Sequence, residues 1–106
     1  MDNYNNRQYK LMLQKISLFR QGKIEIPDLI GDLEGLLNAL EEPNSNWKNT
    51  FQIECGELEQ VYAFALYEER DYLNQKDIKV IEKVLDNIIL LINEKITIEN
   101  EFEFEI

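Results

Sequence analysis

The chain has 106 residues and a formal net charge of −10, with 44% apolar and 30% charged residues. A sequence of this length and composition buries one hydrophobic core, so we expect one folded domain and exclude a disordered chain. It contains no apolar run of the ~18–20 residues that span a membrane, and we expect no secretory signal, because its start lacks the apolar segment. The single cysteine, Cys55, has no partner for an internal disulfide, which favours the cytoplasm.

The residue types that are missing argue against catalysis. The sequence has no histidine, the commonest general base and metal ligand, and only one cysteine, so a zinc site is not expected. It also lacks a glycine-rich phosphate loop and a GxSxG nucleophile motif. We therefore predict a protein that is not an enzyme and needs no metal or cofactor. An enzyme that uses carboxylates with a metal ion is the alternative, and stabilisation by Mg²⁺ or Mn²⁺ would indicate it.

Two amphipathic helices are predicted in the first part of the chain. Helical spacing of apolar residues predicts the first helix, which stops at Gly22; these residues are Tyr9, Met12, Leu13, Ile16 and Phe19. The second helix begins near Pro27, with Asp28 close to the positive end of its dipole, and ends before Pro43. Its apolar face consists of Leu29, Ile30, Leu33, Leu36, Leu37 and Leu40.

The third predicted helix spans about residues 47–69 and follows a polar turn in which Ser45 or Asn46 is the expected N-cap. Its inner face is interpreted as core and consists of Trp47, Phe51, Cys55, Leu58, Tyr62, Ala65 and Leu66. The fourth helix begins after Asn74, which forms a near capping box with Asp77. Its apolar stripe consists of Ile78, Ile81, Leu85, Ile88 and Ile92.

These segments predict an all-α fold, an antiparallel four-helix bundle over residues 1–95, because short connections favour antiparallel neighbours. The tail, residues 96–106, differs: its apolar residues alternate with glutamates, among them Glu101 and Glu103, as in a half-buried strand. We therefore expect an extended or short β tail. Three arrangements are left open: a disordered acidic extension, a hairpin that turns at Glu99-Asn100, and a strand that pairs with a partner's sheet.

Acidic residues are concentrated in the middle of the chain, where residues 25–71 hold twelve carboxylates against Lys48 and Arg70. Such a surface attracts basic proteins and repels nucleic acid and anionic membranes, so we expect direct binding to neither of the latter. One flank of the third helix, beside the core stripe, carries Glu54, Glu57, Val61, Phe64 and Glu68, with Ile53 and Tyr67 just beyond. Two interpretations are open: the flank packs against a neighbouring helix, or its aromatic side chains and glutamates contact a partner.

The runs LIGDLEGLLNALEEP (29–43), WKNTF (47–51) and ELEQVYAFALYEE (57–69), preceded by FRQGKIEI (19–26), give the chain a recognisable layout. This layout resembles the small acidic helical immunity proteins that bacteria make beside their own toxins, of the colicin D and contact-dependent growth inhibition type. The likeness covers about residues 16–92 and lies in layout and composition, so no residue is transferred by motif. It implies a cytoplasmic inhibitor that blocks the active site of a toxin's nuclease domain, whose basic cleft complements an acidic surface. The alternating tail is not expected of this family.

We therefore predict a non-enzymatic immunity protein, or antitoxin, that binds a basic nuclease toxin in a 1:1 complex. The predicted contact residues are Asp32, Glu54, Glu57, Phe64, Tyr67, Glu68, Glu101 and Glu103. The alternative is a small helical adaptor or regulatory protein that acts as a homodimer, with the tail as an exchanged or paired strand. A monomer in light scattering at micromolar concentration would disfavour that alternative.

Overall fold

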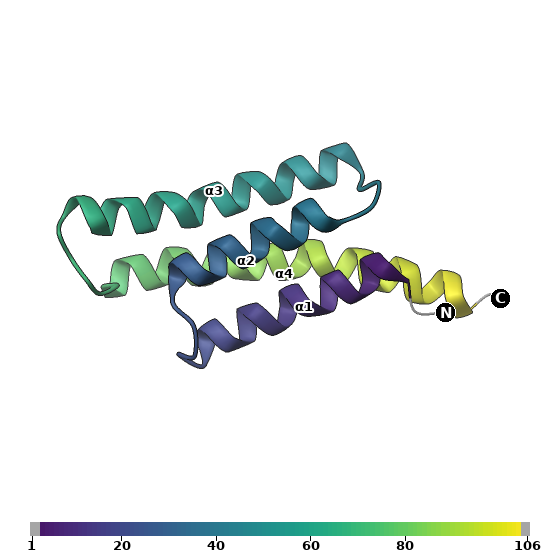
Figure 1. Ribbon diagram of the computed structural model, residues 1–106, viewed down its shortest axis with the longest axis horizontal. Coiled ribbons are helices and arrows are strands. Elements are labelled where there is room, and N and C mark those ends of the chain that lie inside the picture. The colour runs from purple at the N-terminus through teal and green to yellow at the C-terminus, as the bar shows by residue number, and fades with distance from the viewer. Residues whose placement is uncertain (1–2, 105–106) are drawn as a thin grey trace.

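The computed structural model describes the backbone of residues 3–104 and the side chains of residues 3–96 (Figure 1). The described residues form four helices: α1 (Tyr4–Arg20), α2 (Ile26–Ala39), α3 (Ser45–Tyr67) and α4 (Gln75–Phe104). No strand occurs within residues 3–104. Within the same part of the chain, no helix combines the length and the apolar character needed to cross a membrane.

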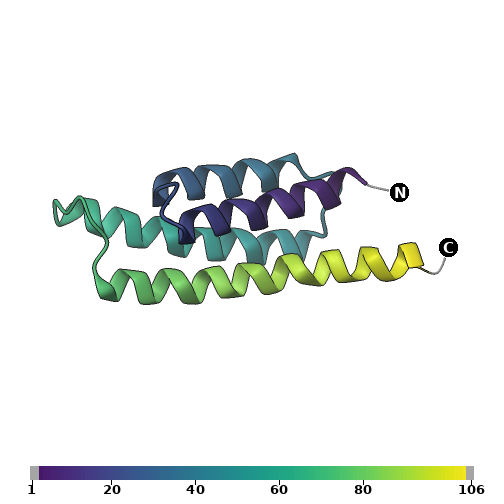
Figure 2. The same ribbon diagram turned by 90° about the horizontal axis from the view of Figure 1, so that it is seen from below.

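The four helices form an antiparallel bundle. Going round the bundle, α1 packs against α2, α2 against α3, α3 against α4, and α4 against α1. Figures 1 and 2 show the helices running alternately in opposite directions, with α1 and α2 as one hairpin and α3 and α4 as the other. The predicted all-α four-helix bundle is confirmed.

Local hydrogen bonds end α1 and begin α4 where the sequence predicts. Gly22 takes a φ of 75°, its N–H donates to the carbonyl of Phe19, and the Lys23 N–H donates to that of Leu18. This is a Schellman motif, in which the left-handed residue is usually glycine. At α4, the Asp77 N–H donates to Asn74 Oδ1 at 2.9 Å, and the Asn74 N–H donates to Asp77 Oδ2 at 3.0 Å. The predicted glycine stop and capping box are both confirmed.

The N-cap of α3 differs from the prediction. The Trp47 N–H donates to Asn44 Oδ1 at 3.0 Å, so Asn44 caps the helix and not Ser45 or Asn46. Asn44 directly follows Pro43 and has a non-helical backbone, with a φ of −58° and a ψ of 130°, as an N-cap residue requires. The helix therefore begins and ends two residues earlier than expected.

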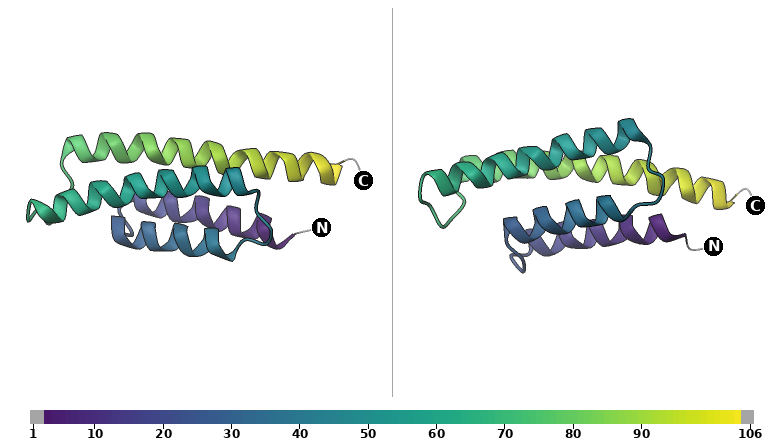
Figure 3. Two further views of the ribbon diagram at one scale, coloured as in Figure 1. Left: turned by 90° about the horizontal axis from the view of Figure 1, so that it is seen from above. Right: turned by 45° about the horizontal axis from the view of Figure 1, so that its top comes forward.

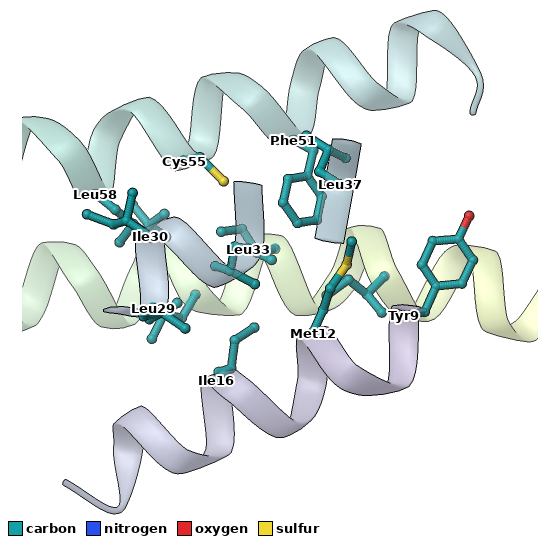
Figure 4. Packing of buried hydrophobic residues seen from close by; sticks show 14 of the residues in the cluster. Tyr9, Met12, Ile16, Leu29, Ile30, Leu33, Leu37, Phe51, Cys55 and Leu58 are labelled. Carbon is teal, nitrogen blue, oxygen red and sulfur yellow. The ribbon is translucent and has the colours of Figure 1, made fainter. Parts of the chain in front are cut away.

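The core is a single cluster to which all four helices contribute. Figure 4 shows side chains of α1, α2 and α3 meeting in it, among them Met12, Leu33 and Phe51, which are fully buried. Cys55 belongs to this cluster and is 2% exposed, as expected of a small apolar residue. The predicted apolar stripes therefore account for most of the buried side chains.

Trp47 joins three helices at the end of the bundle where α3 begins. Its indole N–H donates to the Leu91 carbonyl of α4 at 3.0 Å. Its ring meets Tyr9 of α1 edge-on, with the two ring centroids 5.8 Å apart. These contacts confirm that Trp47 is a packing residue, since a buried indole needs both apolar neighbours and a hydrogen-bond acceptor.

The two hairpins differ in length. The helices α3 and α4 have 23 and 30 residues, whereas α1 and α2 have 17 and 14. At 1.5 Å per residue, α3 is longer than α2 by about 13 Å, and the α3–α4 turn projects beyond the α1–α2 turn (Figure 3). Leu66 and Ile78, both predicted to lie in the core, are consequently 54% and 46% exposed. These two predictions are wrong because α1 and α2 end before they can cover this part of α3 and α4.

The predicted extended or short β tail is not found in the described residues. The backbone of residues 96–104 continues α4 as a helix, and residues 105–106 lie outside the described part of the chain. A helix pairs its backbone N–H and C=O groups within its own segment, whereas a strand needs a neighbouring strand. Residues 3–104 provide no sheet edge for it, so the alternation of glutamates and apolar residues does not produce a strand here.

Candidate protein-binding site

Four of the predicted contact residues lie along one flank of α3, beside its core stripe and on the side nearer α4. These are Glu54, Glu57, Phe64 and the C-cap residue Glu68, and they are called the acidic flank below. Both carboxylate oxygens of Glu54 lie 3.4 Å from Nδ2 of Asn87 on α4, so this end of the flank is packed against α4. Glu57 is exposed, and the Phe64 side chain is 57% exposed.

Tyr67 lies further round α3, on its outer face, and is 84% exposed. Ile53 on the same face is 63% exposed. The packing interpretation of this side of α3 therefore holds for Val61, which contacts the core, and for Glu54, but not for the aromatic residues. Phe64 and Tyr67 are large apolar side chains in contact with water, which is what an interface anchor provides before its partner binds.

Asp32 does not join these residues. It lies on the α1 side of α2, where its Oδ2 is 3.5 Å from Nζ of Lys15. The acidic flank lies between α3 and α4, on the other side of the bundle, because α1 and α2 form the opposite hairpin. A single partner surface that includes both Asp32 and the acidic flank is therefore not formed.

Glu101 and Glu103 lie in the last part of α4, and their side chains are outside the described residues.

The basic residues beside the acidic flank are a feature that sequence reasoning missed. Lys76 and Lys83 of α4 are exposed and share one helix face with Asn87, the residue that meets Glu54. The helical spacing of α4 shows that Lys76, Lys83 and Asn87 share a face. That this face lies beside the acidic flank depends on the packing of α4 against α3, which the sequence does not show. The surface on this side of the bundle therefore carries both signs of charge, with the carboxylates on α3 and the ammonium groups on α4.

A second feature lies at the end where α3 and α4 project. A hollow of about 600 Å³ opens between the α1–α2 turn, the last two turns of α3 and the α3–α4 turn, and it is called the overhang hollow below. Its apolar lining is formed by Phe19, Ile24, Ile26, Tyr62, Leu66, Tyr72 and Leu73. The charged residues that also line it are Glu25, Glu69, Arg70 and Asp71.

Arg70 holds the α3–α4 turn in place. Its Nη1 donates to Asp77 Oδ2 at 2.7 Å and to the Tyr72 carbonyl at 3.1 Å, and its Nε donates to Glu68 Oε1 at 2.8 Å. The Arg70 side chain is only 11% exposed. The hydrogen bond from Arg70, aided by that from the Asn74 N–H, lowers the pKa of the Asp77 carboxyl below its ordinary value. Arg70 and Asp77 thus neutralise one another within the protein, and the α3–α4 turn is fixed before any partner binds.

A pair of carboxyl groups lies between α2 and α3, on the side away from α4. Glu34 of α2 is within side-chain hydrogen-bonding reach of Glu59 of α3, and this contact, together with burial, raises the pKa of Glu34. Burial, with smaller effects from nearby glutamates, raises the pKa of the Cys55 thiol to about 12. This thiol is therefore a poor nucleophile at neutral pH. No group of three or more His, Cys, Asp or Glu within the described residues is arranged to hold a metal ion.

Comparison with protein-family models, with curated proteins and with solved structures finds no match to this chain.

Glu69 offers a test of strain beside the overhang hollow. It takes a φ of 57° in a Schellman motif that ends α3, with the Arg70 N–H donating to the Ala65 carbonyl. Because a left-handed conformation costs a residue with a Cβ about 1–2 kcal/mol, we expect Glu69→Gly to raise the free energy of unfolding by about 0.5–1 kcal/mol in urea denaturation. Gly22→Ala is the matched control and should lower it by about 1 kcal/mol. A destabilised Glu69→Gly variant would contradict strain at this position.

The carboxyl pair predicts a pH-dependent stability. A carboxyl whose pKa is raised by folding destabilises the protein above the folded-state pKa, and the cost disappears below the unfolded-state pKa. We therefore expect Glu34→Gln to be more stable than the wild type by about 0.5 kcal/mol at pH 7, with the difference vanishing in acid, as measured by urea denaturation across pH. Glu94→Gln, which removes one exposed charge from α4, should show a smaller change. An advantage of Glu34→Gln that persists unchanged in acid would contradict the raised pKa of Glu34 as its cause.

Proposed function

We propose that this chain is a cytoplasmic immunity protein that binds the nuclease domain of a basic toxin and blocks its active site. The observation that carries the proposal is the acidic flank, where an exposed Phe64 lies among glutamates of one helix. A nuclease cleft must attract phosphates and is therefore lined by cations. A surface that combines carboxylates with an apolar anchor complements such a cleft in both charge and chemistry.

The mechanism requires no chemistry from the inhibitor. The net charge of −10 speeds the encounter with a basic protein, since opposite fields raise the association rate. Phe64 and Tyr67, at 57% and 84% exposed, then supply apolar area that becomes buried and slows dissociation. Once bound, the acidic flank occupies the position of the nucleic-acid backbone. The same charge disfavours direct binding of this chain to nucleic acid or to anionic membranes.

The lysines of α4 indicate which face of the bundle the partner covers. Lys76 and Lys83 border the acidic flank on the α4 side, where a basic toxin is repelled. The partner is therefore expected to sit toward the outer face of α3, where Tyr67 and Ile53 lie, and to leave the outer face of α4 uncovered. Like-charge contacts cost enough to set the orientation of a complex.

Charge reversal at Glu54, Glu57 and Glu68 together tests the surface. We expect the triple lysine variant to bind the cognate toxin at least about a hundredfold more weakly, mainly through a slower association rate, and to lose cell protection. Binding kinetics and a toxin survival assay are the measurements. Reversal of Glu41 and Glu42, which lie between α2 and α3, makes the same change in net charge as reversal of Glu54 and Glu57 alone and is the matched control for that double variant.

Glu68 also contacts Arg70, so the double variant at Glu54 and Glu57 is measured beside the triple variant, with a thermal melt of each. Unchanged affinity and protection in a folded triple variant would show that the acidic flank is not the contact surface.

The C-terminal tail is included in the proposed contact through Glu101 and Glu103. The backbone of residues 97–104 is helical, so pairing with a sheet edge of the toxin in an extended form would require this part of α4 to unwind. Deletion of residues 97–106 is expected to leave the thermal melt unchanged and to weaken toxin binding, since backbone pairing and charge contacts are lost. Unaltered binding would remove the tail from the interface, and a lowered melting temperature would assign it to the fold.

The alternative of a homodimeric adaptor has support from the exposed apolar residues Ile53 and Tyr67 on α3. One fact weighs against it: two copies that each carry a charge of −10 repel one another. The immunity function is preferred because a basic partner makes use of the charge, whereas a second copy must overcome it.

A further inference from the structure

The overhang hollow exists because the core is left open at one end of the bundle. The inward-facing stripe of α3 continues past the α1–α2 turn, so Leu66 is 54% exposed although its neighbour Ala65 is 4% exposed. Ile78, near the start of α4, is likewise 46% exposed. Apolar residues at core positions that no part of the described chain covers are available to a partner.

The wall of the overhang hollow is largely apolar, and one side of the hollow is open to solvent. Tyr62 and Leu73 are partly buried against the core, and Leu66 and Tyr72, at 54% and 61% exposed, line its open side. Its volume of about 600 Å³ falls within the range of pockets that bind organic groups. The hollow therefore has room for a large apolar side chain. Its apolar wall does not by itself distinguish a positively charged ligand from a negatively charged one.

The rim of the hollow supplies the charge. Glu25, Glu69 and Asp71 line it, and none of them forms an ion pair with another residue of the described chain. Two cations at this end are held by other carboxylates: Arg70 by Glu68 and Asp77, and Arg20 by Glu82 and Asp86. The exposed lysines at this end, Lys23, Lys76 and Lys79, do not line the hollow and offset its three rim carboxylates only from a distance. The rim therefore favours cations and disfavours anions.

The hollow is also held in shape before anything binds. Arg70 ties the α3–α4 turn to the start of α4 through Asp77, and its guanidinium carbon lies 5.7 Å from the ring centre of Tyr72. Glu69 at the rim keeps a left-handed backbone, a conformation that costs free energy and that proteins retain where geometry matters. A preorganised pocket loses less entropy when it is occupied.

We propose that the overhang hollow binds an apolar side chain of the protein partner that is flanked by lysine or arginine residues. The apolar group would contact Leu66 and Tyr72, and the cations would meet Glu25, Glu69 and Asp71. The inference rests on the proposed function in that the partner is a basic protein. The carboxylates of the rim repel anionic lipids and phosphates. They also disfavour a second copy of this chain, because that copy carries the same net charge of −10.

The test uses the full-length protein and synthetic peptides, without any toxin. The probe is acetyl-Lys-Lys-Phe-Lys-Lys-amide, titrated into isotopically labelled protein and followed by backbone amide shifts. Two matched peptides replace either the lysines by serine or the phenylalanine by alanine. We expect saturable shifts around Leu66 and Tyr72 with a Kd near ~1 mM for the first peptide, and at least about tenfold weaker binding for the other two.

Protein variants locate the site. Leu66→Ser should weaken binding of the lysine–phenylalanine peptide about tenfold, and so should the double variant Glu69→Lys with Asp71→Lys. Leu90→Ser is the matched control, because Leu90 is 66% exposed on α4 and does not line the hollow. All the substituted residues are exposed, so folding should be retained, and a thermal melt confirms this for each variant.

The outcomes separate this inference from the proposed function. Peptide binding that Leu66→Ser weakens about tenfold and Leu90→Ser leaves unchanged supports the hollow. Three results would each overturn the inference. The first is the absence of shifts at ~1 mM peptide, and the second is equal binding of the serine-flanked peptide. The third is a set of shifts at the hollow that appear without peptide and grow with protein concentration, which would identify a second copy as the occupant. If the peptide fails to bind while reversal of the acidic flank abolishes toxin neutralisation, the inference falls and the immunity function stands. If the peptide binds the hollow but reversal of the acidic flank leaves toxin neutralisation unchanged, the inference stands and the acidic flank is not the toxin contact.

Discussion

A four-helix bundle seals its core only over the length that all four helices share, and here the two hairpins are unequal. The helices α1 and α2 have 17 and 14 residues, and α3 and α4 have 23 and 30. Over the shared length the interior is closed, with residues such as Leu33, Phe51 and Leu85 fully buried. Beyond it, the same apolar stripes meet water. The places where this molecule offers apolar surface follow from that difference in length.

The projecting end cannot be stabilised by core packing, and polar contacts take over that role. Arg70 connects Glu68 at the end of α3 to Asp77 at the start of α4, and Asn74 and Asp77 cap α4 reciprocally. Each of these bonds contributes modestly. The reciprocal Asn74–Asp77 bonds satisfy backbone N–H groups at the start of α4, and the Arg70 bonds fix the turn between the two helices. The acidic flank and the overhang hollow both adjoin this corner, but they lie on different sides of α3, because Phe64 and Leu66 are two residues apart in the helix.

Much of the fold follows from local patterns in the sequence. Helical spacing of apolar residues, the glycine at position 22 and the Asn74–Asp77 pair depend on neighbours within a few residues, and the structure confirms them. The exposure of Leu66 could not be predicted in the same way, because it depends on where α1 ends and α2 begins relative to α3. The N-cap of α3 was placed one or two residues too late, since Asn44, Ser45 and Asn46 are all good capping residues. The alternation in the tail predicts an extended segment, but within residues 3–104 no strand is present for it to pair with, and its backbone is helical to residue 104.

The candidate site was predictable residue by residue but not as a surface. The spacing of Glu54, Glu57, Phe64 and Glu68 places them on one flank of α3 whatever the tertiary structure. The position of Asp32 on the opposite hairpin, and that of Lys83 beside the flank, depend on which helices are neighbours. The Arg70 network was missed because its members are separated by a turn whose path the sequence does not reveal.

The burial of Cys55 has a consequence for how the bundle moves. This is the only thiol in the chain, it is 2% exposed on the α2-facing side of α3, and its pKa is raised to about 12. A thiolate forms readily only after water reaches the sulfur, and Cys55 lines a hollow between α2 and α3 that is open to solvent. The rate at which the thiol reacts with an alkylating reagent therefore measures how often local movements of α2 and α3 expose the sulfur.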